Sequence, residues 1–420
     1  MRRILALFLF FALAFAADRL YVAPDDGVGY LRSLVQHTKR ELDLALYLWT
    51  RGRLDLAEAL AKARRRGVRV RVLLDERPGG EPQDPRVLQV LKEAGVEVRF
   101  SSPLRFAHYH IKAMRADGRL WISTGNWTRS SFSKNREYSL VTDREDWVAE
   151  FKKVFEADWE ARALALDDAK LVWSPERVYS IFRPFWEGNA KRRVLELIAG
   201  AQRDLLIEQN GLTDEDVFNA LLDAMDRGVR VRVLGSASAR ESNYFGRMAK
   251  RLAEEGARVR YLEGLKVHAK AMLVDGRRAF LGSQNFTPTA FTANRELGAV
   301  LEGGPALERL RATMEADWAR ARPALRPPRG PVPWYEAGRY LGQTIQVEGR
   351  VIGVRDAGGV YRLLFDPEER FVVVIPKAEA RRFALDGYVG RLVRVTGRVR
   401  AFRGRPEIVV KSPKQIEVVP

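Results

Sequence analysis

Four side chains in the second half of the chain have the types and spacing that phosphate chemistry needs. His268 and Lys270 stand two residues apart in a stretch whose alternating pattern predicts a strand with both side chains on one face. A predicted turn and returning strand then bring Ser283 and Asn285 towards the histidine. An imidazole can attack phosphorus or move a proton, while an ammonium, a hydroxyl and an amide can hold anionic oxygens. The stretch therefore predicts a phosphate-handling site.

A second copy of the pattern lies in the first half of the chain. A single His-x-Lys usually marks a solvated strand face, but His110, Lys112 and Asn126 recur in a matching frame, although the chain has only four histidines. Thr124 takes the place of the serine, so a hydroxyl is retained. Two copies favour a functional interpretation over a structural one.

These residues resemble the signature of the phospholipase D superfamily, which is H-x-K, four residues, D, six residues and G-S-x-N, present twice. The second copy, with Asp275 and Gly282, fits throughout. The first copy, with Asp117, is one residue shorter and has Ser for Gly and Thr for Ser. Each copy is followed by Asn-Arg-Glu, ending at Glu137 and Glu296, where the family has a glutamate that orients the catalytic histidine. The resemblance covers residues 19–320.

The resemblance implies one active site shared by both halves. In this family one histidine forms a phosphohistidine while the other protonates the leaving oxygen and then activates water. We expect His110 to be the nucleophile and His268 the acid. The two motif aspartates are expected to be structural. No spacing typical of metal ligands is present, so we expect neither a metal nor a cofactor. The expected catalytic residues are His110, Lys112, Asn126, Glu137, His268, Lys270, Ser283, Asn285 and Glu296, with Thr124, His108 and Lys266 binding substrate.

An internal repeat must position these residues. The stretch Gly-Val-Arg-Val-Arg-Val-Leu occurs at both 67–73 and 228–234. Each half predicts a strand (42–49; 204–209), a helix (54–66; 215–227), a strand, a helix (85–94; 244–255), a strand and the catalytic hairpin. The expected fold class is α/β, with two pseudo-repeated phospholipase D-like α-β-α sandwich halves at 18–165 and 166–320.

The last hundred residues change character. Five prolines and several arginines at 321–334 predict an extended linker. Residues 335–420 predict strands at 344–355, 360–365, 371–375, 392–401 and 407–419, with a helix at 377–385, which is the order of an OB-fold barrel. The sequences around Tyr340 and Gly390 resemble the nucleic-acid-binding OB-fold family. OB-folds bind single strands through basic residues on such loops and strands. The expected nucleic-acid-binding residues are Arg355, Arg362, Arg370, Arg403 and Arg405, for which a generic basic surface is the alternative.

The N-terminus and the charge bear on where the protein acts. Met1–Ala17 has two arginines, a short apolar run and a small-x-small site, which predicts a cleavable signal peptide and a secreted or periplasmic protein, with an uncleaved anchor as the alternative. The net charge of +18 favours a polyanionic partner. The chain has no cysteine, so disulfides and thiolate metal sites are excluded.

Three functions compete on this evidence. The leading hypothesis is an exported, metal-independent nuclease that cleaves DNA or RNA and acts as a monomer without an obligate protein partner. The main alternative is a phospholipase D that hydrolyses anionic phospholipids. The third is a non-catalytic DNA-binding protein.

Overall fold

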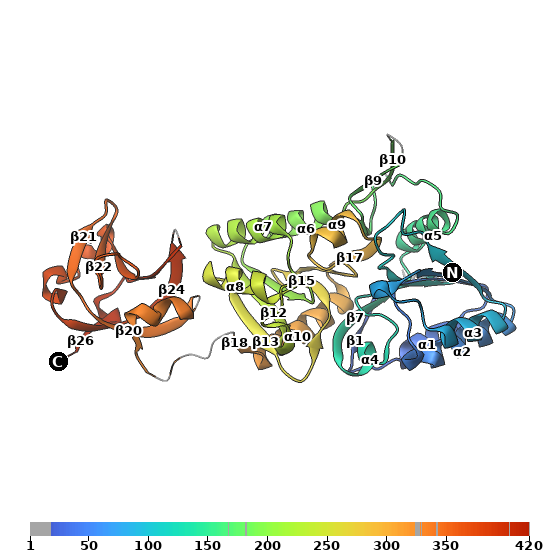
Figure 1. Ribbon diagram of the computed structural model, residues 1–420, viewed down its shortest axis with the longest axis horizontal. Coiled ribbons are helices and arrows are strands. Elements are labelled where there is room, and N and C mark those ends of the chain that lie inside the picture. Colours follow the sequence, from blue (N-terminus) through green and yellow to red (C-terminus); the bar gives the residue numbers. More distant parts are fainter. Residues whose placement is uncertain are drawn as a thin grey trace, which may run out of the picture.

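The computed structural model describes residues 18–166, 168–180, 183–323, 328, 330–341, 343–402 and 404–419. The expected signal peptide at 1–17, part of the expected linker, and Arg403 lie outside the described residues. Figure 1 shows two parts in which helices flank a sheet, followed along the long axis by a C-terminal part built mainly of strands.

The first half is built on one mixed sheet. Its strands follow the order β1-β7-β6-β5-β2-β3-β4, in which β2, β3 and β4 are parallel and β5, β6 and β7 are antiparallel. The elements are β1 (Arg19–Ala23), α1 (Gly29–His37), β2 (Glu41–Leu46), α2 (Leu54–Arg65), β3 (Arg69–Asp75), α3 (Pro85–Glu93), β4 (Glu97–Ser101), β5 (Lys112–Ala116), β6 (Arg119–Ser123), α4 (Arg129–Ser133), β7 (Asn135–Thr142) and α5 (Glu145–Trp159).

The second half repeats this plan. Its sheet order is β18-β13-β12-β11-β15-β16-β17-β8, again with three parallel strands beside three antiparallel ones. The elements are β8 (Val172–Ser174), β9 (Arg177–Ser180), β10 (Arg183–Glu187), α6 (Ala190–Ala199), β11 (Asp204–Gln209), α7 (Glu215–Asp226), β12 (Arg230–Ser236), α8 (Gly246–Glu254), β13 (Arg258–Leu262), β14 (Lys266–Val267), β15 (Lys270–Val274), β16 (Arg278–Gly282), α9 (Pro288–Thr292), β17 (Glu296–Glu302), α10 (Gly304–Arg320) and β18 (Arg322–Pro323).

The α/β class is confirmed, and the repeated stretch explains why. The residues before each copy form an amphipathic helix, α2 or α7, which ends at a glycine with positive φ (Gly67, 91°; Gly228, 89°). Apolar residues of the following strand, β3 or β12, are buried. The sequence predicts one unbroken strand through each histidine, but β5 and β15 begin only at Lys112 and Lys270. His110 and His268 therefore lie just before a strand, where the backbone is free to dock elsewhere.

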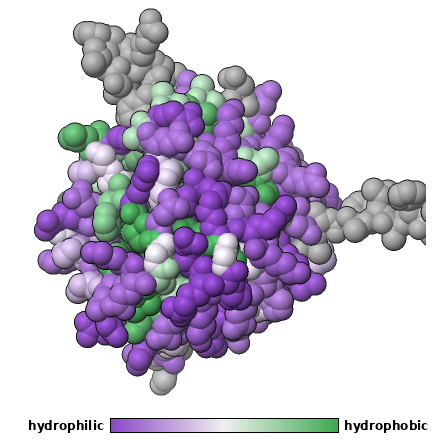
Figure 2. Space-filling view, turned by 90° about the vertical axis from the view of Figure 1, so that its right-hand side faces the viewer, coloured by the Kyte–Doolittle hydropathy of each residue, from purple (hydrophilic) through white to green (hydrophobic). Residues whose placement is uncertain are grey.

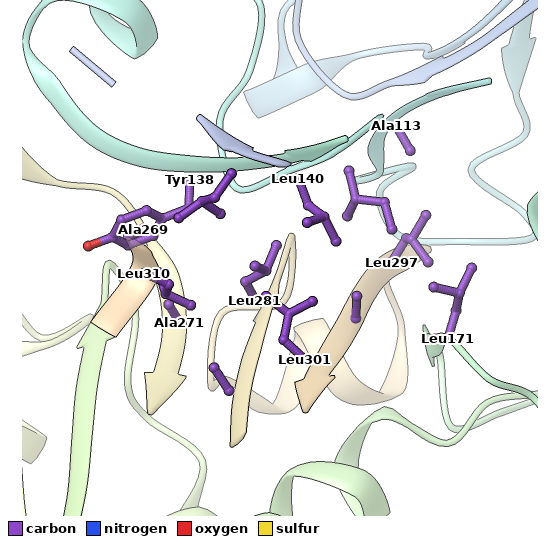
Figure 3. Close-up of a cluster of buried hydrophobic side chains, with 14 of the residues drawn as sticks. Ala113, Tyr138, Leu140, Leu171, Ala269, Ala271, Leu281, Leu297, Leu301 and Leu310 are labelled. Carbon is purple, nitrogen blue, oxygen red and sulfur yellow. The ribbon is translucent and has the colours of Figure 1, made fainter. Parts of the chain in front are cut away.

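The two halves share one apolar core. Ala113, Tyr138 and Leu140 of the first half face Ala271, Leu281 and other residues of the second half (Figure 3). The long helices α5 and α10 contribute buried residues to the same cluster. Separate clusters lie under α1–α3 in the first half and under α6–α8 in the second. Because apolar burial contributes roughly 25 cal/mol per Å², this common core holds the halves in a fixed relation.

The C-terminal part differs from the expected barrel. The predicted first strand is two strands, β20 (Thr344–Arg350) and β21 (Gly353–Asp356), and the predicted helix is reduced to α11 (Lys377–Ala380). The hydrogen-bonded order β19-β20-β24-β25-β23-β22-β21 does not close on itself, so the closed OB barrel is not confirmed. The other strands are β19 (Val332–Pro333), β22 (Val360–Leu364), β23 (Val372–Pro376), β24 (Leu392–Phe402), β25 (Arg405–Val409) and β26 (Ile416–Val419).

The face at the end of the molecule formed by the first half is mainly hydrophilic (Figure 2). Figure 2 shows polar residues over most of this end, with a smaller group of apolar residues near the centre of the view. Within the described ranges, none of the helices combines the length and apolar character needed to cross a bilayer.

Candidate active site

The backbone of each half brings its histidine onto the other half. β14 pairs in parallel with β7, and the His268 N–H donates to the Arg136 carbonyl at 3.2 Å. Reciprocally, the Arg295 N–H donates to the His108 carbonyl at 2.8 Å, two residues before His110. Each histidine segment is therefore attached to the strand that carries the other half's Asn-Arg-Glu.

The two histidines are held crosswise by glutamates. His110 Nδ1 lies 2.7 Å from Glu296 Oε2, and His268 Nδ1 lies 2.6 Å from Glu137 Oε1. Glu137 and Glu296 are buried, whereas the His110 and His268 side chains are 12% and 16% exposed. Because Nδ1 contacts a carboxylate in each pair, the Nε2 atom of each ring is left for a substrate.

Matching hydroxyl and amide groups hold the two glutamates. Thr124 Oγ1 donates to Glu137 Oε2 at 2.7 Å, and Asn135 Nδ2 donates to Glu137 Oε1 at 3.2 Å. Ser283 hydrogen-bonds Glu296, and Asn294 Nδ2 donates to Glu296 Oε1 at 3.1 Å. The altered first copy thus builds the same support as the second.

This support changes the assignment of two hydroxyls. The sequence predicts that Thr124 binds substrate and that Ser283 is catalytic, yet both side chains are completely buried. Each hydroxyl also accepts a backbone N–H, from Tyr138 at 3.0 Å or from Leu297 at 3.0 Å. Both residues position a glutamate instead of meeting a substrate.

Two buried lysines and two asparagines complete the site. Lys270 Nζ donates to the Thr124 carbonyl of the other half at 3.3 Å and lies 3.1 Å from His268 Nδ1. Lys112 Nζ donates to the His110 carbonyl at 2.5 Å. The Oδ1 atoms of Asn126 and Asn285 are buried without a hydrogen-bond partner among the described residues. These oxygens can only accept a hydrogen bond, so any contact of the two side chains with an anionic oxygen has to come from their Nδ2–H groups.

In the His110–Glu296 pair, the uncharged forms of both side chains are favoured. Burial, together with repulsion from Lys112 and Lys270, lowers the pKa of His110 well below its usual value. Burial raises the pKa of Glu296 to about 8, which Lys112, Ser283 and Asn294 only partly offset. At neutral pH this pair therefore disfavours separated charges, and a neutral imidazole is the form that can act as a nucleophile.

The second pair differs from the first in the pKa of its glutamate. Burial opposes ionisation of Glu137, but His268, Lys270 and Thr124 outweigh it and lower the pKa of Glu137 to about 2. Burial lowers the pKa of His268, and attraction to Glu137 partly offsets this. Burial also lowers the pKa of Lys270 to about 8. The net pKa of His268 stays below its usual value, so the ionised Glu137 offsets only part of the burial that disfavours a proton on this ring.

The remaining motif residues lie at the edge of the site. His108 is 39% exposed, with Nδ1 3.8 Å from Asp75 Oδ2, and Lys266 is exposed on β14. Asp117 and Asp275 each accept three backbone N–H groups, from residues 39–41 and 202–204, so both lock turns as expected. Across the part of the chain that the structure describes, no three or more His, Asp or Glu side chains form a group suited to a metal ion.

Sequence reasoning missed three residues that shape the site. Asp75 and Ser236 end β3 and β12. Each accepts the backbone N–H of the residue before a motif histidine, from Tyr109 at 2.5 Å and from Val267 at 2.8 Å. Both stand two residues after the repeated stretch, so the repeat itself was an available signal. Tyr47 packs its ring edge-on against His110, with centroids 4.6 Å apart, and lies under the Lys112 ammonium.

The arginines of the two Asn-Arg-Glu motifs lock the halves together. Arg136 bonds Asp317 of α10 at 2.6 Å, and Arg295 bonds Asp158 of α5 at 2.8 Å. Both pairs cross between the halves and are almost completely buried. In each motif, therefore, the asparagine hydrogen-bonds the glutamate, the arginine joins the two halves, and the glutamate orients a histidine.

The expected nucleic-acid-binding arginines are largely ion-paired. Arg355 and Arg362 both contact Glu369, and Arg370 contacts Asp366 and Glu368. Arg405 begins β25, and Arg403 lies outside the described residues. Their role in binding stays a prediction, weakened by the carboxylates beside three of them.

Comparison with known proteins places this geometry in a family. The family model described as "Cardiolipin synthase, PLD-like domain" matches residues 31–159 and 194–318, which include both histidine motifs. Mitochondrial cardiolipin hydrolase of Xenopus laevis is 34% identical over 139 residues, covering 33% of this chain and 64% of the relative. Probable cardiolipin synthase YwiE of Bacillus subtilis (strain 168) is 25% identical over 316 residues, covering 69% of this chain and 61% of the relative. The chain thus spans less than two thirds of the length of these relatives.

Solved structures share the fold at low identity. Polyphosphate kinase from Porphyromonas gingivalis matches with a TM-score of 0.54 and 17% identity, over 72% of this chain and 47% of that chain. Phosphatidylserine synthase of Haemophilus influenzae Rd KW20 matches with a TM-score of 0.53 and 13% identity, over 73% of this chain and 87% of that chain. With both halves matched by the family model, the chain belongs to the phospholipase D superfamily, within the family of cardiolipin synthase, PLD-like domains.

Proposed function

We propose that this protein is a phosphodiesterase that acts on phospholipids through a phosphohistidine intermediate. The observation that carries the proposal is the crosswise pairing of His110 with Glu296 and of His268 with Glu137. This pairing supports one shared site in which the two imidazoles have glutamates of different pKa. Two-step transfer at phosphorus needs two such groups, one as nucleophile and one as acid.

The substrate preference differs from the leading sequence-based hypothesis. That hypothesis favours a nuclease, but the family model that matches this chain is described as a cardiolipin synthase domain, and the similar proteins are named cardiolipin synthase and cardiolipin hydrolase. We therefore favour the lipid alternative. Transfer of a phosphatidyl group to an alcohol and hydrolysis by water are both compatible with it, because the same intermediate serves both.

The proposed first step forms a P–N bond. Neutral His110 attacks phosphorus through Nε2, the bond to the leaving oxygen breaks, and that oxygen takes a proton from His268. The lowered pKa of His110 and the ionised Glu137 beside His268 support this order. Lys112, Lys270 and the amides of Asn126 and Asn285 stabilise the charge on the non-bridging oxygens.

The proposed second step releases the product. His268, now neutral, accepts a proton from water or an alcohol, whose oxygen attacks phosphorus as the P–N bond breaks. His110 leaves as the neutral imidazole with the Glu296 contact intact. No step requires a metal, so we propose metal-independent chemistry.

The first experiment compares substrates. The purified protein is incubated with vesicles of phosphatidylcholine and phosphatidylglycerol, and separately with plasmid and single-stranded DNA, each with and without EDTA. We expect lipid turnover that EDTA leaves unchanged, to cardiolipin and glycerol by transfer or to phosphatidic acid by hydrolysis. DNA cleavage without lipid turnover would restore the nuclease hypothesis.

The matched variants are His110→Ala and His37→Ala. His37 ends α1 and contacts only Ser33 through its side chain in the described structure, so its loss should leave turnover unchanged. His110→Ala should abolish turnover. Acid-labile, base-stable phosphate trapped on a peptide that contains His110 would support the nucleophile assignment, and label on His268 would reverse it.

For the C-terminal part we propose an OB-like module at 335–420. β20 and β21 stand near opposite ends of the hydrogen-bonded order but are consecutive in the chain, separated only by Val351 and Ile352. This continuity supports a barrel-like closure through the backbone. Salt-sensitive binding of the full chain to an oligonucleotide, lost in Arg355→Gln with Arg405→Gln, would support nucleic-acid binding.

We also propose that Met1–Ala17 directs export and is removed. Expression in a bacterial host and N-terminal sequencing test this, with a mature start near Ala17 expected and retention of Met1 as the contrary result.

A further inference from the structure

An arginine-lined cavity lies between the second half and the C-terminal part, away from the catalytic histidines. It has a volume of about 280 Å³ and is lined by α8, β13, β18, β20 and β24. Arg258, Arg260 and Arg398 line it, and its described lining includes no aspartate or glutamate. β13 is three strands from β15 in the sheet, which corresponds to about 14 Å at the usual strand spacing, so this cavity is separate from the Lys270 site.

The three guanidinium groups lack the carboxylate partners that other arginines here have. Arg260 donates to the Trp318 carbonyl at 2.8 Å, and Arg398 donates to the Gly256 carbonyl. Among the described residues, Arg258 forms no ion pair and no side-chain hydrogen bond. The neighbouring outward-facing arginines of β24 differ, because Arg394 bonds Glu348 and Arg400 bonds Glu407.

The electrostatics of the cavity favour an anion. Burial and repulsion from Arg258 lower the pKa of Arg398, and burial and the same repulsion lower the pKa of Arg260. A carboxylate would compensate only one of three charges, whereas a phosphate monoester carries about −1.5 to −2 near neutral pH. Guanidinium groups also match the oxygen spacing of phosphate in paired hydrogen bonds.

We propose that this cavity is a second phosphate site, which binds a dianionic phosphate between Arg258 of β13 and Arg398 of β24. Such an anion bridges the catalytic part and the C-terminal part. The phosphate is either the free ion or the terminal phosphomonoester of a lipid such as phosphatidic acid.

The test counts phosphate sites in the full-length protein by titration calorimetry at low salt. Wild type should bind two phosphates per chain, one in each site. Arg258→Gln with Arg398→Gln should lose one or weaken it at least 10-fold, while Lys270→Met should lose the other. The matched control, Arg65→Gln with Arg381→Gln, removes the same charge from exposed positions and should keep both.

Further measurements distinguish the source of the bound phosphate and control for loss of folding. Arg398→Lys keeps the charge but not the planar fork, so it should fold as wild type and bind phosphate several-fold more weakly. Tighter binding of glycerol 3-phosphate and of vesicles with phosphatidic acid than of inorganic phosphate would identify a lipid as the source of the phosphate. Tighter binding of inorganic phosphate would identify the free ion. Turnover of a soluble diester should stay unchanged in the arginine variants, which separates this proposal from the catalytic one. The proposal of a second site would be overturned if the Arg258→Gln with Arg398→Gln variant still bound two phosphates. It would also be overturned if the wild type bound only one phosphate and Lys270→Met removed it.

Discussion

At the scale of single residues, the site depends on how closely the residues around each glutamate pack against it. Gly125 stands against Glu137, and a Cβ added there would lie 2.9 Å from the Glu137 carboxyl carbon. The family signature leaves this position open, and the second copy has Gln284 there. In the first copy a small residue is needed because Glu137 passes close to the backbone in order to reach His268.

Gly125→Ala should therefore displace Glu137 and misplace His268. We expect turnover to fall about 100-fold, since a misplacement near 1 Å is enough for that loss, with a stability cost of about 1–3 kcal/mol from overpacking. Steady-state kinetics and thermal unfolding measure the two effects. Gly118→Ala is the control, because a Cβ there meets nothing within 4 Å. Equal activity of both variants would contradict this account of Gly125.

The pH dependence of turnover follows from two groups that titrate near pH 8. The pKa of Glu296, raised to about 8 by burial, means that the His110–Glu296 pair loses its proton as the pH rises towards 8, which frees the His110 lone pair. Above 8, Lys270 loses its own proton, since burial lowers its pKa to about 8, and its hold on phosphate oxygens weakens. We expect a bell-shaped profile of kcat/KM with its maximum near pH 8. An acidic limb centred near 5 would argue against this role for Glu296.

At the scale of elements, β7 and β17 do most of the positioning. β7 begins with Asn-Arg-Glu, whereas β17 begins at Glu296, directly after Asn294 and Arg295. The arginine of each motif bonds an aspartate on the long helix of the other half. Arg295 is fully buried and stacks on Trp186, 3.4 Å from the ring centroid, while it bonds Asp158. The strand is therefore fixed by the same contact that joins the halves.

Arg295→Met should destabilise the protein strongly. The change leaves Asp158 buried without its cation, which typically costs about 3–5 kcal/mol. Adding Asp158→Asn should recover part of that loss, because the stranded charge is removed. Arg251→Met is the control, since the Arg251–Glu215 pair is exposed and worth about 0–1 kcal/mol. Denaturant unfolding followed by tryptophan fluorescence compares the four proteins, and similar losses in Arg295→Met and Arg251→Met would contradict the lock.

At the scale of the whole molecule, one shared core holds the two halves together. The side chains of the candidate site come from segments held by apolar contacts and cross-half hydrogen bonds. Within that interface Tyr138 donates its hydroxyl to Glu208 of β11 at 2.7 Å, and Glu208 is completely buried. The interface therefore contains an ionisable group, Glu208, whose burial depends on the contact between the halves.

Stability should fall with rising pH because of Glu208. Burial, reinforced by Asp317, raises the pKa of Glu208 from 4.5 to about 8 in the folded state. The folded protein thus keeps a proton that the unfolded chain releases, so this contribution is complete below pH 4.5 and is lost as the pH rises to 8. Between those values the slope is about 1.4 kcal/mol per pH unit. Glu208→Gln should flatten that slope in thermal unfolding from pH 5 to 9, whereas an unchanged slope would rule out this group.

The pattern of the chain was enough to predict the repeat, the main helices and most of the residues that meet in the candidate site. Strand and helix signals are local, so β11 is found at its predicted bounds and α2 and α7 within one residue. The spacing within each His-x-Lys pair is also local, because the two residues stand two positions apart in the chain. The Asn-Arg-Glu repeat identified Glu137 and Glu296 by the same kind of spacing.

Only the tertiary structure decided which partner each of these residues has. Glu296 serves His110 across 186 residues, and the hydroxyls of Thr124 and Ser283 serve glutamates instead of substrate. Local periodicity contains no information about such pairings, because they depend on how two apolar faces pack and which polar groups are buried with them. The same reason explains why the ion pairs of Arg355 and Arg362 with Glu369 were not evident from the sequence. Nor was the arginine-lined cavity that Arg258 and Arg398 share.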